Sequence, residues 1–452
     1  MSKYLYGASV QGIQEFIFAT NKLQEIVGAS ELVKQIAQEF EKHYEADEVL
    51  LNAAGNIKAV FNSKERCEEV VLEFSKIIQQ KAYGITLSQA VVEFDGKYTQ
   101  KDIDSLEKKL KIQRNRPSII LNLSSNIMKL NPSTAKPLVN KDNDRATDQK
   151  LKAYKEIEKD ETFKELKDIS NSKNKLAVIH IDGNGLGKLI PNLKIPLSEF
   201  SKKLDEATQK AFDDAKEGNR VREIILGGDD VTVICDANDA LHFTKDFLKN
   251  FEEETKQRFD TLTACAGIAY CNEKYPFHYA VDLAEALCGV AKNHSNREHS
   301  SLMFHNIQSS NYQSWDKFIE DELTIKNDTQ TIRCDFGAYY LDKDKKEEAN
   351  ISDFINTLEA YRCDGSPISR LRNWLSELYK SDVNANNLLK RINAIVEEKD
   401  NWNCKIMDKN LKYFNKNLSN DTLIISKDGF TKTPIYDILQ ILSITDKPKD
   451  LK

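Results

Sequence analysis

The sequence predicts an α+β protein with two ferredoxin-like βαββαβ units and a helical C-terminal domain. Apolar strand patterns and amphipathic helix patterns follow one another in the order βαββαβ over the first hundred residues. The same order returns in the middle of the chain, and helical periodicity dominates towards its end. We expect a first unit at 1–105, a linker or insertion at 106–172, a second unit at 173–325 and a helical domain at 326–452.

In the first unit, alternating apolar residues indicate strands and 3.6-residue periodicity indicates helices. The expected strands are Lys3–Val10, Val49–Leu51, Ile57–Phe61 and Ile85–Phe94. The expected helices are Ile13–Phe18, Glu31–Tyr44 and Glu65–Lys81. The two middle strands are joined by Asn52-Ala-Ala-Gly-Asn56, a hairpin signal that carries no carboxylate.

The insertion has a weaker pattern. Ser118–Leu123 has the composition of a strand, and the polar stretch Asn131–Gln149 favours an exposed loop. Ala153–Asp168 is typical of a charged surface helix.

The second unit repeats the order of the first with little sequence identity. Its expected strands are Leu176–Ile181, Val221–Leu226, Val231–Cys235 and Leu262–Tyr270, followed by a short strand at Ser301–Phe304. Its expected helices are Leu197–Ala215, Ala240–Phe259 and Tyr279–Lys292. Further helices are expected at Ile351–Tyr361, Ile368–Tyr379, Asn386–Glu398 and Pro434–Leu442.

Composition excludes several classes of protein. The chain has 452 residues, of which 40% are hydrophobic and 30% charged, a soluble globular profile. Its net charge of -6 gives no case for non-specific nucleic-acid binding. It lacks an apolar run long enough to span a membrane and a signal-peptide core. Eight cysteines without a Cys-x-x-Cys pair favour buried free thiols over structural zinc, so we expect a cytoplasmic protein.

Three aspartates are the candidate metal ligands and catalytic residues. Asp182 ends an apolar strand, and Asp229 and Asp230 lie in the hairpin Gly227-Gly228-Asp229-Asp230, whose two glycines suit a tight turn. Since these strands are neighbours in the predicted sheet, about 4.8 Å apart, the carboxylates can share one hard cation such as Mg²⁺. The plain alternative is an ordinary acidic hairpin turn.

A glycine-rich turn follows Asp182. Its residues Gly183, Gly185, Leu186 and Gly187, together with Gly228 of the hairpin, leave backbone N–H groups open to a triphosphate. The glycine spacing fits neither a Walker motif nor a dinucleotide fingerprint. Lys188 could neutralise phosphate or be a solvated lysine.

Two nearby residues have plainer interpretations. His180, on the same strand face as Asp182, fits a satisfied core histidine. Lys292 fits a cation at a helix C-terminus.

These residues together resemble the palm-type cyclases and polymerases, in particular the large, cyclic-oligoadenylate-synthesising subunit of type III CRISPR effector complexes. In the first palm the match is carried by Tyr6-Gly-Ala-Ser-Val-Gln-Gly-Ile-Gln-Glu-Phe-Ile-Phe18 and Gly28-Ala-Ser30. In the second it is carried by Asp182-Gly-Asn-Gly-Leu-Gly187, Gly227-Gly-Asp-Asp230, Ala266-Gly-Ile-Ala-Tyr270 and Ala284-Glu-Ala-Leu-Cys-Gly-Val-Ala-Lys292. Ser366-Pro-Ile-Ser-Arg-Leu371 resembles the start of the C-terminal domain.

The resemblance implies an activity and a site. Asp182, Asp229 and Asp230 would bind Mg²⁺ or Mn²⁺, Lys292 would contact a triphosphate, and Ser30 would contact ATP from the first palm. The implied reaction joins ATP molecules by attack of a 3′-hydroxyl on an α-phosphate, releases pyrophosphate and closes a cyclic oligoadenylate. Guide RNA and other CRISPR effector subunits, docked through the helical domain, are the implied partners in antiviral defence.

The sequence departs from the family pattern in three places. Asn184 stands where a second acid is usual. The first palm begins at the N-terminus without the HD nuclease domain of many members, so we do not expect DNA cleavage by this chain. The insertion between the palms lacks zinc-binding cysteines.

Two other functions stay open. One is a non-catalytic scaffold of a ribonucleoprotein complex, which Asn184 favours. The other is a diguanylate-cyclase-like enzyme that uses GTP, although that family has Gly-Gly-Asp/Glu-Glu-Phe where this chain has Asp230-Val231.

Overall fold

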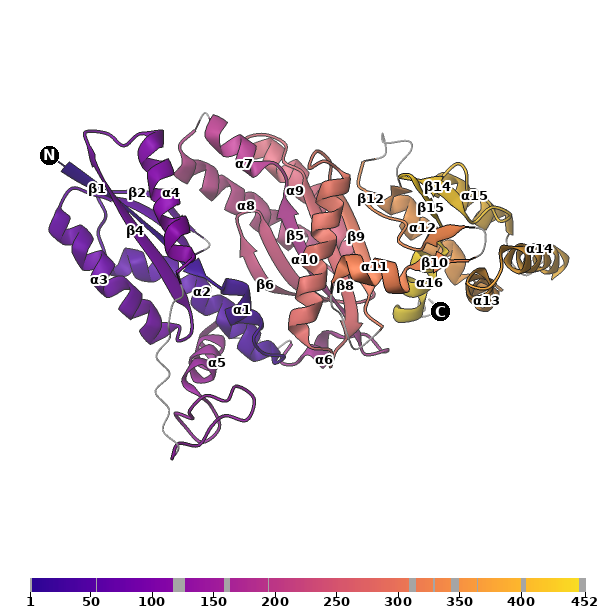
Figure 1. The fold of residues 1–452 in the computed structure, drawn as a ribbon, viewed down its shortest axis with the longest axis horizontal. Helices are drawn as coiled ribbons and strands as arrows, with labels where there is room; N and C mark the ends of the chain where they lie inside the picture. Colours follow the sequence, from indigo (N-terminus) through magenta and orange to yellow (C-terminus); the bar gives the residue numbers. More distant parts are fainter. Residues whose placement is uncertain are drawn as a thin grey trace. The chain divides into compact units, whose positions relative to one another are not determined.

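The computed structural model describes residues 2–53, 55–116, 127–157, 163–193, 195–308, 314–327, 330–342, 349–363, 365–399 and 404–446. It is a mixed α+β structure, and its strands form several sheets, as predicted (Figure 1). The chain divides into two compact units. The first comprises residues 1–168, 187–208 and 223–228, and the second comprises residues 169–186, 209–222 and 229–452.

The first sheet has four antiparallel strands in the order β2-β3-β1-β4. Its strands are β1 (Ser2–Gln11), β2 (Glu48–Ala53), β3 (Asn56–Phe61) and β4 (Thr86–Asp95). Its helices are α1 (Ile13–Phe18), α2 (Leu23–His43) and α3 (Lys64–Lys81). The element order agrees with the predicted one, but α2 begins at Leu23 rather than Glu31, because apolar residues of its first turns are buried.

Both faces of the first sheet are covered. On one face, Phe40 of α2 stacks on Tyr6 of β1 with ring centroids 5.9 Å apart and meets Phe74 of α3 edge-on. On the other face lies α4 (Gln100–Arg114), whose Leu106 and Leu110 are buried against β4. Sequence analysis did not identify α4.

The insertion differs from the prediction. Helix α5 (Arg145–Ile157) begins inside the stretch expected to be an exposed loop, and α6 (Leu166–Ile169) is short. Ala153 and Tyr154 are buried, so α5 is not a surface helix. It packs on α2 where Gly28 has no side chain, since a Cβ there would lie 1.8 Å from the Lys150 carbonyl oxygen. The strand expected at Ser118–Leu123 falls outside the described residues.

The second sheet has seven strands in the order β13-β12-β9-β8-β5-β7-β6. They are β5 (Lys175–Gly183), β6 (Val221–Gly227), β7 (Asp230–Asp236), β8 (Ala264–Asn272), β9 (Ser301–Asn306), β12 (Tyr339–Tyr340) and β13 (Ala349–Asn350). The helices within this stretch are α7 (Leu186–Leu189), a 3₁₀ turn (Ile190–Asn192), α8 (Leu197–Lys216), α9 (Ala240–Arg258) and α10 (Phe277–His294).

The central strand β5 is antiparallel to both β7 and β8. Its residues 176–179 and 181 are at most 1% exposed, which explains their uninterrupted apolar run. Helix α10 lies directly on β8, because Gly267 has no Cβ and one placed there would be 1.9 Å from the Ala284 carbonyl oxygen.

The part of the chain beyond residue 314 is not purely helical. It contains α11 (Trp315–Glu322), α12 (Ile351–Arg362), α13 (Ile368–Leu378), α14 (Asp382–Lys399), α15 (Cys404–Phe414) and α16 (Ile435–Ile444). It also contains a four-stranded sheet of β10 (Thr324–Lys326), β11 (Thr331–Arg333), β14 (Ile425–Lys427) and β15 (Phe430–Lys432). The four predicted helices are present, whereas α15 and this small sheet were not predicted.

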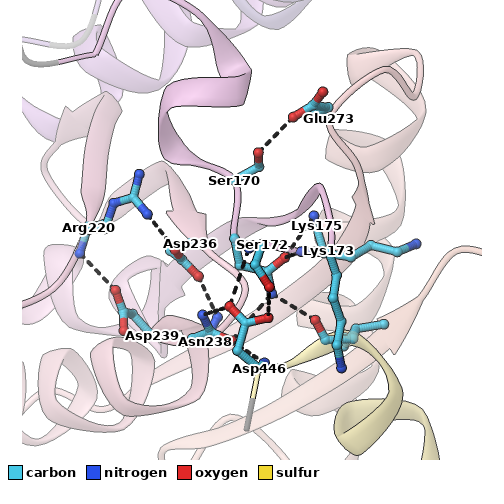
Figure 2. A network of polar contacts seen from close by, with 12 residues as sticks. Ser170, Ser172, Lys173, Lys175, Arg220, Asp236, Asn238, Asp239, Glu273 and Asp446 are labelled. Carbon is cyan, nitrogen blue, oxygen red and sulfur yellow. Dashed lines mark hydrogen bonds and ion pairs between the residues drawn. The ribbon is translucent and has the colours of Figure 1, made fainter. Parts of the chain in front are cut away.

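A polar network ties residues 443–446 to the start of β5 (Figure 2). The Asp446 carboxylate accepts hydrogen bonds from Ser172 Oγ at 2.5 Å and Asn238 Nδ2 at 2.9 Å. Lys173 Nζ donates to the Ser443 carbonyl oxygen at 3.0 Å. The segment after α16 is therefore fixed beside the base of the central strand.

Two expectations about the chain as a whole can be checked in the described residues. Cys235, Cys265 and Cys288 are buried free thiols, as predicted. None of the described helices is both long and apolar enough to cross a membrane.

Candidate active site

The Gly227-Gly228-Asp229-Asp230 hairpin is held from α8. The Asp205 carboxylate accepts a hydrogen bond from Gly228 N at 2.6 Å, and Thr208 Oγ1 donates to the Gly228 carbonyl oxygen at 2.5 Å. Only Gly228 has a positive φ, +62°, so the expectation that both glycines supply this conformation is corrected. Asp205 and Thr208 were missed, because on an amphipathic helix they look like ordinary polar surface residues.

The end of β5 lies beside the start of β7, as predicted. Asp182 is the register partner of Asp230, and Gly183 N donates to the Asp229 carbonyl oxygen at 3.2 Å. A Cβ at Gly183 would lie 2.7 Å from the Asp229 Cβ, so the absence of a side chain lets Asp229 approach the strand. Asp182 and Asp229 are in hydrogen-bonding contact.

Neighbouring carboxylates oppose the ionisation of Asp229 and Asp230. Burial and the neighbouring Asp182 raise the pKa of Asp229 to about 6. Burial, with Asp182, Asp229 and Glu285 nearby, raises the pKa of Asp230 to about 7. The Asp230 side chain is 46% exposed, yet its Oδ1 is buried without a hydrogen-bond partner in the structure. An electropositive ligand would relieve this concentration of negative charge.

Lys292 supplies a positive charge at this place. It lies in the last turn of α10, and its Nζ is 2.5 Å from Asp182 Oδ2 and 2.8 Å from the Gly183 carbonyl oxygen, to which it donates. The lysine is 7% exposed. The plain interpretation, a cation at a helix C-terminus, agrees with its position in the last turn of α10, and Lys292 is in addition buried beside Asp182.

His180 lies below the carboxylates on β5. Its Nδ1 is 3.2 Å from Thr232 Oγ1 and 3.6 Å from Asp230 Oδ1. Burial lowers the pKa of the imidazole to about 4, so it is neutral at pH 7. This agrees with a core histidine that has a hydrogen-bond partner.

The acidic residues partly fit a divalent cation. Carboxylate oxygens are the donors that Mg²⁺ and Mn²⁺ prefer, and the unpartnered Asp230 Oδ1 offers one more. Among the described residues, however, no three His, Cys, Asp or Glu side chains are gathered as a metal-binding group. The chemistry of the donor set fits such an ion, while the present arrangement pairs Asp182 with Lys292.

The glycine turn after Asp182 is open. Gly185 has a φ of +76°, and side-chain atoms placed at Gly185, Gly187 or Gly228 would meet nothing within 4 Å. Leu186 begins the short helix α7. The backbone of this turn is thus uncovered in the way that a phosphate-binding loop requires.

Asn184 turns away from the carboxylates. Its Nδ2 donates to Thr263 Oγ1 at 3.0 Å, and its backbone N donates to the Thr263 carbonyl oxygen at 2.8 Å. The residue is 3% exposed. Asn184 therefore anchors the glycine turn to the segment before β8.

Ser30 occupies a different environment from the one expected of a ligand contact. It is 6% exposed on α2, and its Oγ donates to the Ile224 carbonyl oxygen. In this structure the hydroxyl is already engaged.

The sheet order β8-β5-β7-β6, with an acid at the end of the central strand, an acidic hairpin beside it and a glycine turn after it, is consistent with a palm domain. Residues 175–301 match the family model described as Cas10/Cmr2, second palm domain. For this part of the chain, the match confirms the resemblance to the family that the motifs of the second palm predicted. A search of curated proteins returned no match.

Several solved structures with a similar fold are of Csm1–Csm4 assemblies. A Csm1–Csm4 cassette in complex with AMPPNP matches at 13% identity and a TM-score of 0.55, covering 98% of this chain and 69% of the other. The cassette in complex with cA4 matches at 13% identity and a TM-score of 0.54, with the same coverage. In the Csm1–Csm4 subcomplex of the type III-A interference complex, the chain spans 54% of the matched chain, at 15% identity and a TM-score of 0.47.

Proposed function

We propose that this protein is a metal-dependent nucleotidyltransferase that makes a cyclic oligoadenylate from ATP in CRISPR-type defence. The observation that supports this most is the convergence of Asp182, Asp229 and Lys292 at one end of β5, beside an open glycine turn. The similar Csm1–Csm4 structures were determined with AMPPNP, cA4 and cA3. ATP is therefore the substrate that the fold and the site together favour.

Each residue has a role in this proposal. Asp182, Asp229 and Asp230 would hold Mg²⁺ or Mn²⁺, which supplies charge stabilisation on the transferring phosphate and the departing pyrophosphate. The backbone N–H groups at Gly185, Leu186 and Gly187 would bind phosphate oxygens, and Lys292 would neutralise them. The N–H groups of Gly183 and Gly228 are left out of this role, because they donate to the Asp229 carbonyl oxygen and the Asp205 carboxylate. The 3′-oxygen of one ATP forms a bond to the α-phosphorus of another, and the bond to pyrophosphate breaks.

The rest of the chain has roles in the same proposal. We take residues 1–105 and 173–325 as two ferredoxin-like palm domains, joined by 106–172 and followed by the C-terminal domain at 326–452. Ser30 would approach ATP only if its hydrogen bond to the Ile224 carbonyl oxygen gave way. Because the similar structures are Csm1–Csm4 complexes, we propose that other effector subunits and guide RNA are partners.

The test is direct. The purified protein, alone and with its effector partners and activating RNA, is incubated with ATP and Mg²⁺ or Mn²⁺. Pyrophosphate and cyclic adenylate products are expected, with GTP unable to replace ATP. Asp229→Asn should lower the rate at least about 100-fold. No product under any of these conditions would contradict the proposal.

A scaffold role is the second candidate, and two observations favour it. Lys292 already pairs with Asp182, and Asn184 faces away from the acids. In that case RNA would co-purify with the protein, and ATP binding would not respond to Mg²⁺ or to Asp229→Asn.

A further inference from the structure

The first unit contains a cavity of about 530 Å³ that the proposed reaction does not use. It lies at the end of β1 and the start of β4, where Gln11 and Thr86 are register partners. The end of α4, the loop before α5, and α5 itself complete its walls. All of its lining residues belong to the first unit, and its size falls within the usual range of small-molecule sites.

Positive charge dominates this cavity. Arg114, Arg116, Lys136 and Lys150 line it, and Glu15 is the lining carboxylate. Within the part of the chain that the structure describes, none of these four cations forms an ion pair with a carboxylate. The chain as a whole is acidic, with a net charge of -6, so this concentration of positive charge is local.

Lys150 is the most constrained of the four. It is 6% exposed, its Nζ donates to the Phe16 carbonyl oxygen at 2.6 Å, and it lies 4.3 Å from the centre of the Phe16 ring. Burial lowers the pKa of this amine to about 8. Glu25 and Asp144 lie close enough to favour the charged amine, but burial outweighs them, and a buried cation is costly unless further negative charge compensates it. An anion in the cavity would provide that compensation.

Arg114 adds a directed donor. One of its nitrogens, Nη2, donates to Ser9 Oγ at 2.8 Å, which fixes the guanidinium beside β1. The planar group has further N–H donors, in the geometry that suits phosphate oxygens.

The cavity repeats a position in the chain's own internal symmetry. In the first sheet β1 lies between β3 and β4, and in the second sheet β5 lies between β7 and β8. Helix α4 follows β4 in the chain, and helix α10 follows β8 in the same way. Arg114 occupies the last turn of α4, as Lys292 occupies the last turn of α10. The first unit thus has a helix-end cation at the same place, and its further cations come from the segment after α4 and from α5.

We propose that this cavity binds the polyphosphate group of a nucleotide, using Arg114, Arg116, Lys136 and Lys150 as its cationic contacts. The site needs no metal, because the side chains themselves neutralise the anion. It does not depend on the nucleotidyltransferase activity proposed above.

The test measures binding of inorganic tripolyphosphate to the full chain by calorimetry, in EDTA at low salt. Arg116→Ala and Lys136→Ala should each weaken binding about tenfold, the loss expected for one charge-assisted contact. Lys111→Ala, an exposed lysine on α4 outside the cavity, should change the dissociation constant less than about twofold. Circular dichroism melts of each variant check that the fold is intact.

Further measurements identify the source of the phosphate and separate this site from the acidic one. ATP and a linear oligoadenylate with a 5′-triphosphate are titrated in parallel, and the tighter ligand identifies the natural one. Asp229→Asn should leave tripolyphosphate binding unchanged even where it abolishes catalysis. Absence of binding, binding insensitive to Arg116→Ala and Lys136→Ala, or equal sensitivity to Lys111→Ala would overturn the proposal.

Discussion

Gly183 sets how closely the hairpin approaches the central strand. Its neighbour Asp182 must meet Asp229 across this contact, and the space where a side chain would stand is taken by Asp229 itself. The position therefore combines a packing requirement with a functional one.

We predict that Gly183→Ala destabilises the protein by about 1–3 kcal/mol, because the new methyl group overlaps the Asp229 Cβ. Denaturant unfolding of the variant measures this loss. Gly187→Ala is the matched control, since a Cβ there meets nothing within 4 Å. Equal stability of the two variants would show that the hairpin can move away from β5 without loss of free energy.

Asp229→Asn should separate stability from activity. The raised pKa of Asp229, about 6, means that its carboxylate is held ionised at pH 7–8 at the expense of folding free energy. The amide removes that repulsion, so we expect stability at pH 8 to rise by about 1 kcal/mol while nucleotidyltransfer is lost. Thermal melts at pH 8 and at pH 4 test this, because the gain should disappear at the lower pH.

Among the elements, α10 determines where Lys292 lies, and Gly267 determines where α10 lies. The backbone of α10 packs directly against the Cα of Gly267 in β8, because this residue has no side chain. No other residue type could keep Lys292 within 2.5 Å of Asp182 without moving the helix.

Gly267→Ala should therefore cost about 3 kcal/mol or more, since the added Cβ would lie 1.9 Å from a main-chain oxygen that cannot rotate away. Gly289→Ala on the same helix is the control, because it has open space and should gain about 0.5–1 kcal/mol from helix propensity. Chemical denaturation of both variants gives the comparison. A mild effect of Gly267→Ala would contradict the close packing of α10 on β8.

Long elements with a clear apolar periodicity could be predicted from the sequence, whereas short elements and a strongly charged helix could not. The apolar run of β5 and the periodicity of α9 and α10 gave correct element types with boundaries shifted by a few residues. Helix α4 was missed because it buries only Leu106 and Leu110 in a strongly charged segment. The strands β10, β11, β14 and β15 have three residues each, too few to show an alternation.

For the candidate site, the residue types and the neighbouring strands could be predicted, but the contacts between side chains could not. Strand order alone brings Asp182 beside Asp230, so this proximity follows from the predicted topology. The support from Asp205 and Thr208 and the ion pair between Lys292 and Asp182 depend on side-chain packing that a motif does not record.

At the scale of the whole molecule, buried acids link folding stability to pH. Asp437 of α16 is 5% exposed and accepts hydrogen bonds from Tyr339 Oη at 2.5 Å, Phe336 N at 3.2 Å and Gln440 Nε2 at 2.9 Å. Burial outweighs these bonds and raises the pKa of Asp437 to about 7.

Between about pH 4 and pH 7 the unfolded chain loses the Asp437 proton and the folded chain keeps it. The contribution of this carboxyl to stability is therefore complete below about pH 4 and is lost as the pH rises through 7. Comparing Asp437→Asn with the parent by urea unfolding across this range should show the parent falling relative to the variant by roughly 2–4 kcal/mol. If the free energies of unfolding of the parent and the variant changed with pH in parallel, Asp437 would have to be ionised in the folded protein.

The pairing of β12 with β9 makes the second sheet continue into residues 339–340 and 349–350. A recombinant fragment that stops at residue 325 would strip β9 of this neighbour and leave a hydrogen-bonding edge of mostly apolar character. Such a piece should self-associate in solution, whereas one extended past α12 should stay monodisperse in size-exclusion chromatography. The part of the chain that carries the candidate site is thus an unsuitable target for minimal-domain expression unless its C-terminal neighbour is kept.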